Sequence, residues 1–156
     1  MRLALVVALS LLAASAAAQT GPTDRLSLDE VLRNHVRAVQ GRDLAALERT
    51  VTAGEQLDVI FPDGRRSTTR AEYLAFHREW FAERNWRITI RPVGRVERDD
   101  LALVTARTRY EEREGRRVTG WSENWLTLTF AREAAGWRLV HDQNTRIRSG
   151  PNPPGG

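Results

Sequence analysis

The stretch that decides the fold is Gly120–Ile147, GWSENWLTLTFAREAAGWRLVHDQNTRI. It predicts two long strands joined by the turn 134–136, because apolar and polar side chains alternate on both sides of a glycine-containing turn. On the first strand, one face carries Trp121 and Trp125, and the other is formed by Leu126, Leu128 and Phe130. On the second strand, one face carries Trp137, Leu139, His141, Gln143 and Thr145. Polar groups at the end of such a face indicate a sheet that lines a cavity.

Helical signals precede these strands. The segment 27–30 is a capping box, Ser-Leu-Asp-Glu, and predicts a helix that ends at Gly41. Asp43 is positioned to cap a second, short helix that runs to Thr50. A second capping box, residues 69–72, opens a third helix, whose apolar side chains follow the i, i+3, i+4, i+7, i+8 spacing of a buried stripe.

Further strands lie between and after the helices. Residues 57–61 form the first, followed by a Pro-Asp-Gly turn. Residues 86–90 and 102–110 alternate as strands, and Pro92 predicts a bulge or a sheet edge. The order helix, helix, strand pair, helix and four-strand meander indicates a single α+β domain.

The N-terminus predicts export. A positive Met1-Arg2, an apolar run and three alanines before Gln19 are typical of a signal peptide over residues 1–18, which is shorter than the roughly 20 residues of a bilayer span. We expect a mature protein that begins at Gln19 and is periplasmic or secreted, with no membrane association after processing. The predicted divisions are a leader over 19–25, a domain over 26–148 and a disordered, Pro- and Gly-rich tail over 149–156.

The composition argues against nucleic acid as a partner. All 24 basic residues are arginine, and 20 acidic residues leave a formal net charge of only +4. Acids and bases interleave, as in the run EEREGRR at 111–117, which is typical of a solvated hairpin tip rather than of a basic binding face. The chain has no cysteine, so neither a disulfide nor a lipid-modified N-terminal cysteine is available.

At this point the chain resembles the nuclear transport factor 2-like superfamily, in particular its SnoaL-like branch and related exported domains of unknown function. The resemblance lies in VRAVQGRDLAALE (36–48), LDVIFPDGRRSTTRAEYLAFH (57–77) and GWRLVHDQNT (136–145). It implies a cone-shaped fold, in which a strongly curved antiparallel sheet wraps around three helices and leaves a pocket at the open end. It also implies a homodimer through the outer face of the sheet. No single activity follows, because the superfamily includes isomerases, dehydratases, hydrolases and proteins that only bind or assemble.

Three histidines lie on predicted inward faces, and they are the most informative polar candidates. Combined with the aromatic stripe of the third helix, they predict a ligand-binding pocket lined by Tyr73, His77, Trp80, Tyr110, Trp125 and His141, with His35 as a further candidate. The alternative is that each histidine is a hydrogen-bonded core residue.

Candidates for specific chemistry are few. His141 and Asp142 are neighbours on a strand, so their side chains face opposite ways unless a bulge intervenes. With His141 assigned to the pocket, Asp142 is expected at a dimer interface or sheet rim, and no acid is clearly inside, since Asp58 cannot be assigned to a face. No metal-ligand motif or nucleophile motif occurs, and we expect neither a metal nor a cofactor.

The sequence therefore favours an exported, homodimeric domain that binds a small hydrophobic molecule, with no defined chemistry. The first alternative is an isomerase, dehydratase or hydrolase acting on such a molecule. The second is an accessory subunit whose cone is filled by tryptophan side chains. A buried carboxylate in an open pocket favours the enzyme.

Overall fold

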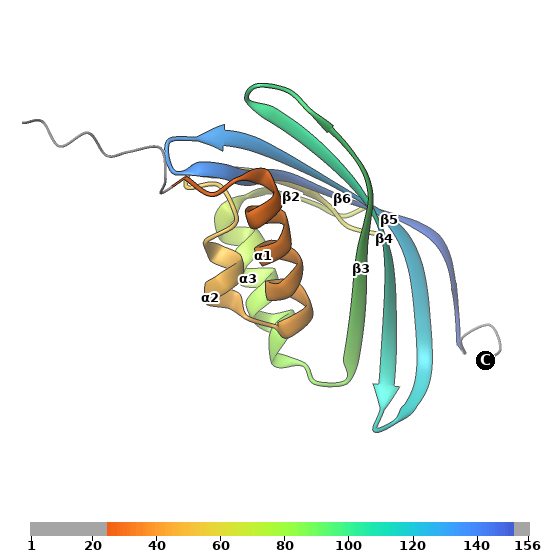
Figure 1. Ribbon diagram of the computed structural model, residues 1–156. Coiled ribbons are helices and arrows are strands. Elements are labelled where there is room, and N and C mark those ends of the chain that lie inside the picture. Colours follow the sequence, from red (N-terminus) through yellow and green to blue (C-terminus); the bar gives the residue numbers. More distant parts are fainter. Residues whose placement is uncertain (1–24, 152–156) are drawn as a thin grey trace, which may run out of the picture.

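The computed structural model describes residues 25–151 (Figure 1). The predicted signal peptide, residues 19–24 of the leader and residues 152–156 of the tail lie outside this range, whereas residues 149–150 of the predicted tail belong to a strand. The elements are α1 (Leu28–Gly41), α2 (Leu44–Glu48), β1 (Gln56–Ile60), β2 (Arg66–Thr69), α3 (Arg70–Ala82), β3 (Trp86–Glu97), β4 (Leu101–Glu114), β5 (Arg117–Glu133) and β6 (Gly136–Gly150).

Six strands form one mixed sheet in the order β2-β1-β6-β5-β4-β3. The sheet bends over the three helices, which all lie on its concave side (Figure 1). It does not close into a barrel, and the chain forms a single α+β domain, as predicted. One departure is that β1 runs parallel to β6, whereas every other neighbouring pair is antiparallel. The crossover through β2 and the meander makes this parallel pairing possible.

The predicted N-terminal caps of the helices are confirmed. Ser27 and Thr69 each form a complete capping box with the glutamate three residues on, and Asp43 caps α2. The end of α1 at Gly41 is confirmed as well. The left-handed residue that follows it is Arg42, with φ 57°, and its guanidinium lies 4.0 Å above the Trp86 ring. That stacking contact offsets the strain that an arginine bears there.

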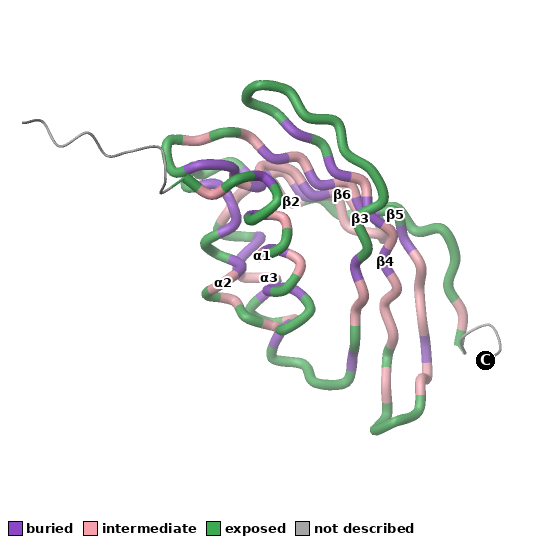
Figure 2. The backbone as a smooth tube through the Cα atoms, in the orientation of Figure 1, coloured by how far each residue is buried: buried purple, intermediate pink, exposed green. Residues whose placement is uncertain are grey.

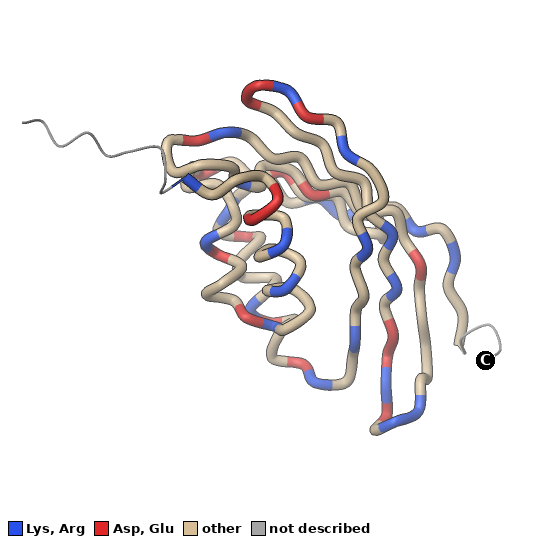
Figure 3. Tube along the Cα trace, viewed as in Figure 1, with Lys and Arg blue, Asp and Glu red and all other residues tan. Residues whose placement is uncertain are grey.

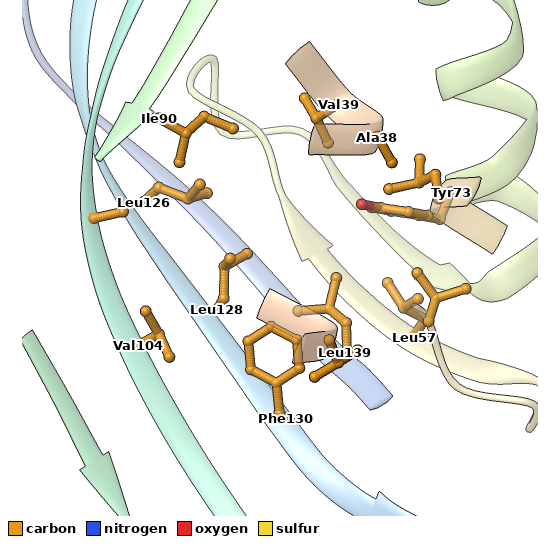
Figure 4. Packing of buried hydrophobic residues seen from close by; sticks show 14 of the residues in the cluster. Ala38, Val39, Leu57, Tyr73, Ile90, Val104, Leu126, Leu128, Phe130 and Leu139 are labelled. Atoms are coloured by element: carbon orange, nitrogen blue, oxygen red, sulfur yellow. The ribbon is translucent and has the colours of Figure 1, made fainter. Parts of the chain in front are cut away.

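The core lies between the helices and the concave face of the sheet. Buried residues follow the inner sides of α1, α3 and the central strands, and the hairpin tips are exposed (Figure 2). Figure 4 shows Leu126, Leu128 and Phe130 of β5 opposite residues of the helices. Charges of both signs alternate on the outside, including the β4–β5 tip (Figure 3).

Several β-bulges bend the long strands. One lies in β3 beside Pro92, on an edge strand, so both features predicted for this proline are present. A second bulge, in β6, determines which side chains of this strand reach the cavity. Phe130 pairs with Leu139, while Thr129 pairs with His141, so Val140 is an extra residue in β6. A bulge of this kind reverses the alternation of side chains beyond it. The strand therefore presents Leu139 and then Asp142 to the core.

Candidate functional site

A cavity of about 240 Å³ lies between the helices and the concave face of the sheet. Apolar side chains from five elements form most of its wall: Val39, Val59, Phe76, Trp80, Ile90 and Leu126. This volume is slightly below the roughly 300–1,000 Å³ of pockets that hold drug-sized ligands. The cavity suits a small, flat and largely apolar molecule.

Asp142 brings a carboxyl group into this cavity. The bulge at Val140 turns it inward, where it is opposite Val59 of β1 and Leu128 of β5. Its Oδ1 has no hydrogen-bond partner among residues 25–151. Burial raises the pKa of Asp142 from 3.8 to about 7, because the charged form is deprived of water. Near neutral pH, the Asp142 carboxyl group is therefore populated in both its protonated and its ionised form.

Hydroxyl and amide groups share the cavity lining with the carboxyl group. Thr108 and Asn124 line the cavity, and the buried Thr108 Oγ1 and Asn124 Oδ1 have no partner in the described part of the chain. Tyr73 is fully buried on α3, and its hydroxyl points toward the sheet (Figure 4). Burial, and then the charge of Asp142, raise the pKa of Tyr73, so its phenol stays neutral. These groups can exchange hydrogen bonds with a bound polar atom.

Two buried histidines also belong to the polar lining, which further includes Tyr110, Ser122, Asn144 and Arg146. His35 Nδ1 is 2.9 Å from Thr50 Oγ1, and His77 Nδ1 is 2.9 Å from the Tyr73 carbonyl oxygen. Burial lowers the pKa of His35 to about 3, with a smaller contribution from His77. Burial lowers the pKa of His77 to about 4, although its bond to the carbonyl oxygen acts in the opposite direction. Both imidazoles are therefore neutral at pH 7.

The structure brings together most of the residues predicted for the pocket. His35, His77, Trp80 and Tyr110 line the cavity. Tyr73 does not line it; its fully buried ring lies 4.1 Å from the ring of His77. Whether these residues bind a ligand stays a prediction.

Trp125 and His141 lie on the other side of the sheet, outside this cavity. Trp125 is 39% exposed, and its ring stacks under the Arg107 guanidinium at 4.7 Å. It follows the inward-facing Asn124 and precedes the buried Leu126, so simple alternation places it outside. His141 is displaced by the Val140 bulge, and its Nδ1 is 3.1 Å from Asp58 Oδ2.

Asp58 also faces outward, between His141 and Arg66. Its Oδ1 accepts a 2.6 Å hydrogen bond from Arg66 Nε. Partial burial raises the pKa of Asp58, but the hydrogen bond and charge of Arg66, together with His141, outweigh this and leave it below its usual value. This outer cluster is separated from the cavity by the sheet itself.

Sequence reasoning missed six polar residues of the cavity lining: Thr108, Ser122, Asn124, Asp142, Asn144 and Arg146. The expectation that no acid lies inside was wrong, because it assumed unbroken alternation along β6. Neither Gly nor Pro marks the bulge at Val140, so the sequence carries no local signal for it. Within residues 25–151, no group of three His, Asp or Glu side chains is arranged to hold a metal ion. None of the helices described combines the length and apolar character needed to cross a membrane.

A family model described as SnoaL-like domain matches residues 28–144. This match covers most of the chain and every residue that lines the cavity except Arg146. The chain belongs to the SnoaL-like family. No curated protein matches it in sequence.

Solved structures place this SnoaL-like domain among nuclear transport factor 2-like folds. A ketosteroid isomerase-like protein from Erwinia carotovora atroseptica has 14% identity and a TM-score of 0.63, with 77% of this chain and 93% of that chain covered. A proposed dehydratase of the nuclear transport factor 2-like family from Streptomyces avermitilis has 19% identity and a TM-score of 0.63, covering 76% and 91%. The CaMKII hub of S. rosetta has 23% identity and a TM-score of 0.59, covering 76% and 92%. At these identities the likeness establishes the fold.

Proposed function

We propose that this SnoaL-like domain is a proton-transfer enzyme, an isomerase or dehydratase that acts on a small, mostly apolar molecule in the cavity. The observation that carries the proposal is the buried carboxyl group of Asp142, whose pKa of about 7 suits both accepting and returning a proton. Solved neighbours named as a ketosteroid isomerase-like protein and a proposed dehydratase add support from the fold.

The role of each group follows from its chemistry. Ionised Asp142 takes a proton from a carbon next to a carbonyl group, and the electron pair of that C–H bond moves to the carbonyl oxygen. Neutral hydroxyl groups, those of Tyr73 and Thr108, donate hydrogen bonds that stabilise the negative oxygen. In a β,γ-unsaturated ketone, the carbonyl group then re-forms, the double bond moves into conjugation and protonated Asp142 gives its proton to the γ carbon, which completes an isomerisation. In a β-hydroxy ketone, re-formation of the carbonyl creates the α,β double bond and breaks the C–O bond, and protonated Asp142 gives its proton to the departing hydroxide to form water, which completes a dehydration.

Proton exchange in deuterated water tests this proposal. 2-Tetralone is a flat, enolisable ketone, and NMR reports the rate at which its acidic C–H groups exchange. We expect the protein to accelerate exchange, the D142N variant to lose this acceleration and D58N, on the outer face, to keep it. If D142N exchanges as fast as the wild type, Asp142 is not the base. Tight binding of the ketone without accelerated exchange would instead favour a binding domain without chemistry.

We also propose that the protein is exported and works as a two-fold dimer. The N-terminal pattern of residues 1–18 supports export. Exposed apolar side chains on the outer face of the sheet support the dimer: Leu103, Trp125 and Ile147 are each 39–40% exposed. The hub named among the structural neighbours offers an example of assembly within this fold.

A further inference from the structure

The hydrogen bonds of His35 determine which of its ring nitrogens carries the proton. Thr50 Oγ1 donates its only proton to the Leu47 carbonyl oxygen at 2.6 Å. It can therefore only accept from His35 Nδ1, 2.9 Å away, and this nitrogen must carry the hydrogen. Nε2 of His35 is left with a lone pair and acts as an acceptor.

His77 is held in the same tautomer by a different partner. Its Nδ1 lies 2.9 Å from the Tyr73 carbonyl oxygen, which has no hydrogen to give. Nδ1 is again the donor and Nε2 the acceptor. Both histidines line the cavity, and neither Nε2 makes a hydrogen bond to any residue in the range 25–151.

The lining therefore contains several acceptors without partners, beside donors such as the Thr108 hydroxyl group and Arg146. In addition to the two imidazole nitrogens, Asn124 Oδ1 and Asp142 Oδ1 lack partners within the described residues. Buried acceptors without partners are costly, so a ligand that donates hydrogen bonds gains the most here. Burial lowers the pKa of both histidines, which means that this environment disfavours positive charge. A neutral donor, a hydroxyl group, fits better than an ammonium group.

We infer that the molecule bound in this cavity carries, besides the carbonyl group of the proposed reaction, an alcohol or phenol hydroxyl group that donates to Nε2 of His35 or His77. Its apolar ring would lie against Phe76 and Trp80, which also line the cavity and stack with a ring separation of 5.8 Å. The inference names the class of substrate for the proposed function. It rests on that function only in taking this cavity as the binding site.

The tautomers can be read directly without any ligand. Long-range proton–nitrogen NMR correlation of the free protein distinguishes Nδ1–H from Nε2–H imidazole. We expect His35 and His77 to show the Nδ1–H pattern from pH 8 down to about pH 5, because burial keeps both neutral. An Nε2–H pattern for both rings would overturn the inference, since the cavity would then present donors.

A matched pair of probes tests the ligand class. 2-Naphthol donates a hydrogen bond, whereas 2-methoxynaphthalene has the same ring and no donor. Quenching of tryptophan fluorescence should show naphthol binding at least about tenfold more tightly to the wild type, the size of one satisfied buried hydrogen bond. In H35F and H77F this preference should shrink severalfold, while H141F, altered on the outer face, should keep it.

Each outcome decides the inference. Equal binding of the two probes, no binding of naphthol up to its solubility limit, or an unchanged preference in both H35F and H77F would overturn it. If one variant fails to fold, the other and the tautomer measurement still decide. Exchange of 2-tetralone is scored separately, so a preference for naphthol without proton exchange would refute only the catalytic proposal. Exchange without this preference would refute only the ligand class.

Discussion

His141 and Asp142 are neighbours in the chain, yet one belongs to the surface and the other to the cavity. His141 contacts Asp58 on the outer face at 3.1 Å, while Asp142 is buried opposite Val59. The extra residue Val140 in β6 produces this arrangement. Without the bulge, the same strand would turn the imidazole inward and the carboxyl group outward. A single backbone irregularity therefore decides which group can do chemistry in the cavity.

The buried carboxyl group of Asp142 should make stability depend on pH. Its folded pKa, about 7, lies above its ordinary value of 3.8, so the folded state holds the proton more tightly than the unfolded chain. Its stabilising contribution is complete below about pH 4 and is lost as the pH rises through 7. We expect D142N to be more stable than the wild type at pH 8, by roughly 2–4 kcal/mol, and similar to it at pH 4.

Urea denaturation at both pH values measures this difference. D58N is the matched control, because the opposite sign applies to Asp58. The lowered pKa of Asp58 stabilises the folded state above the ordinary value and less as the pH falls, and the effect is small on an exposed side chain. Equal stability of D142N and the wild type at pH 8 would mean that Asp142 is hydrated or paired.

The outer position of His141 leads to a second prediction. Its contact with Asp58 joins side chains that are 26% and 34% exposed, and such pairs contribute at most about 1 kcal/mol. H141L should therefore leave naphthol binding unchanged and alter the free energy of unfolding by less than about 1 kcal/mol. Fluorescence titration and thermal denaturation check both parts. Weakened naphthol binding with unchanged stability would instead show that His141 belongs to the binding site.

Local signals in the sequence predicted most of the fold. The capping boxes at Ser27 and Thr69 depend on residues only three positions apart, and they form as expected. Alternation placed Leu126, Leu128 and Phe130 in the core. The site was harder to predict from the sequence. The face on which Asp142 lies depends on how β6 pairs with β5, and this pairing joins residues that are distant in the chain. Alternation counted from Leu139 gives the wrong face for every residue after Val140.

Export predicts a defined mature end. The alanines at positions 16 and 18 are the small residues that signal peptidase requires, so the exported protein should begin at Gln19. N-terminal sequencing of protein recovered outside the cytoplasm measures this directly. A18R should block cleavage and leave the precursor intact, whereas a change at Thr20 should not. Recovery of wild-type exported protein that still starts at Met1 would contradict the prediction.

The dimer prediction concerns Trp125, which presents an exposed ring on the central strand β5. If the outer face pairs in solution, W125E should place a charge in the interface and convert the dimer to a monomer. Light scattering at micromolar concentration reports the mass. V93E, an exposed apolar position on the edge strand β3, is the control and should remain dimeric. A monomer mass for the wild type would exclude this assembly.

Tyr73 offers a way to separate catalysis from stability. Its hydroxyl is buried without a partner among the described residues, so Y73F removes an unsatisfied group and should keep or raise stability, by up to about 1 kcal/mol. If the same hydroxyl donates to the reacting oxygen, Y73F should slow 2-tetralone exchange by about ten- to a hundredfold. Thermal denaturation and the NMR exchange rate, measured on one preparation, check the two parts together. An unchanged exchange rate would remove Tyr73 from the site, and a large loss of stability would mean that the hydroxyl has a structural partner. Slower exchange in a Y73F protein that is at least as stable as the wild type would show that the buried Tyr73 hydroxyl of α3 contributes to the reaction and not to the stability of the fold.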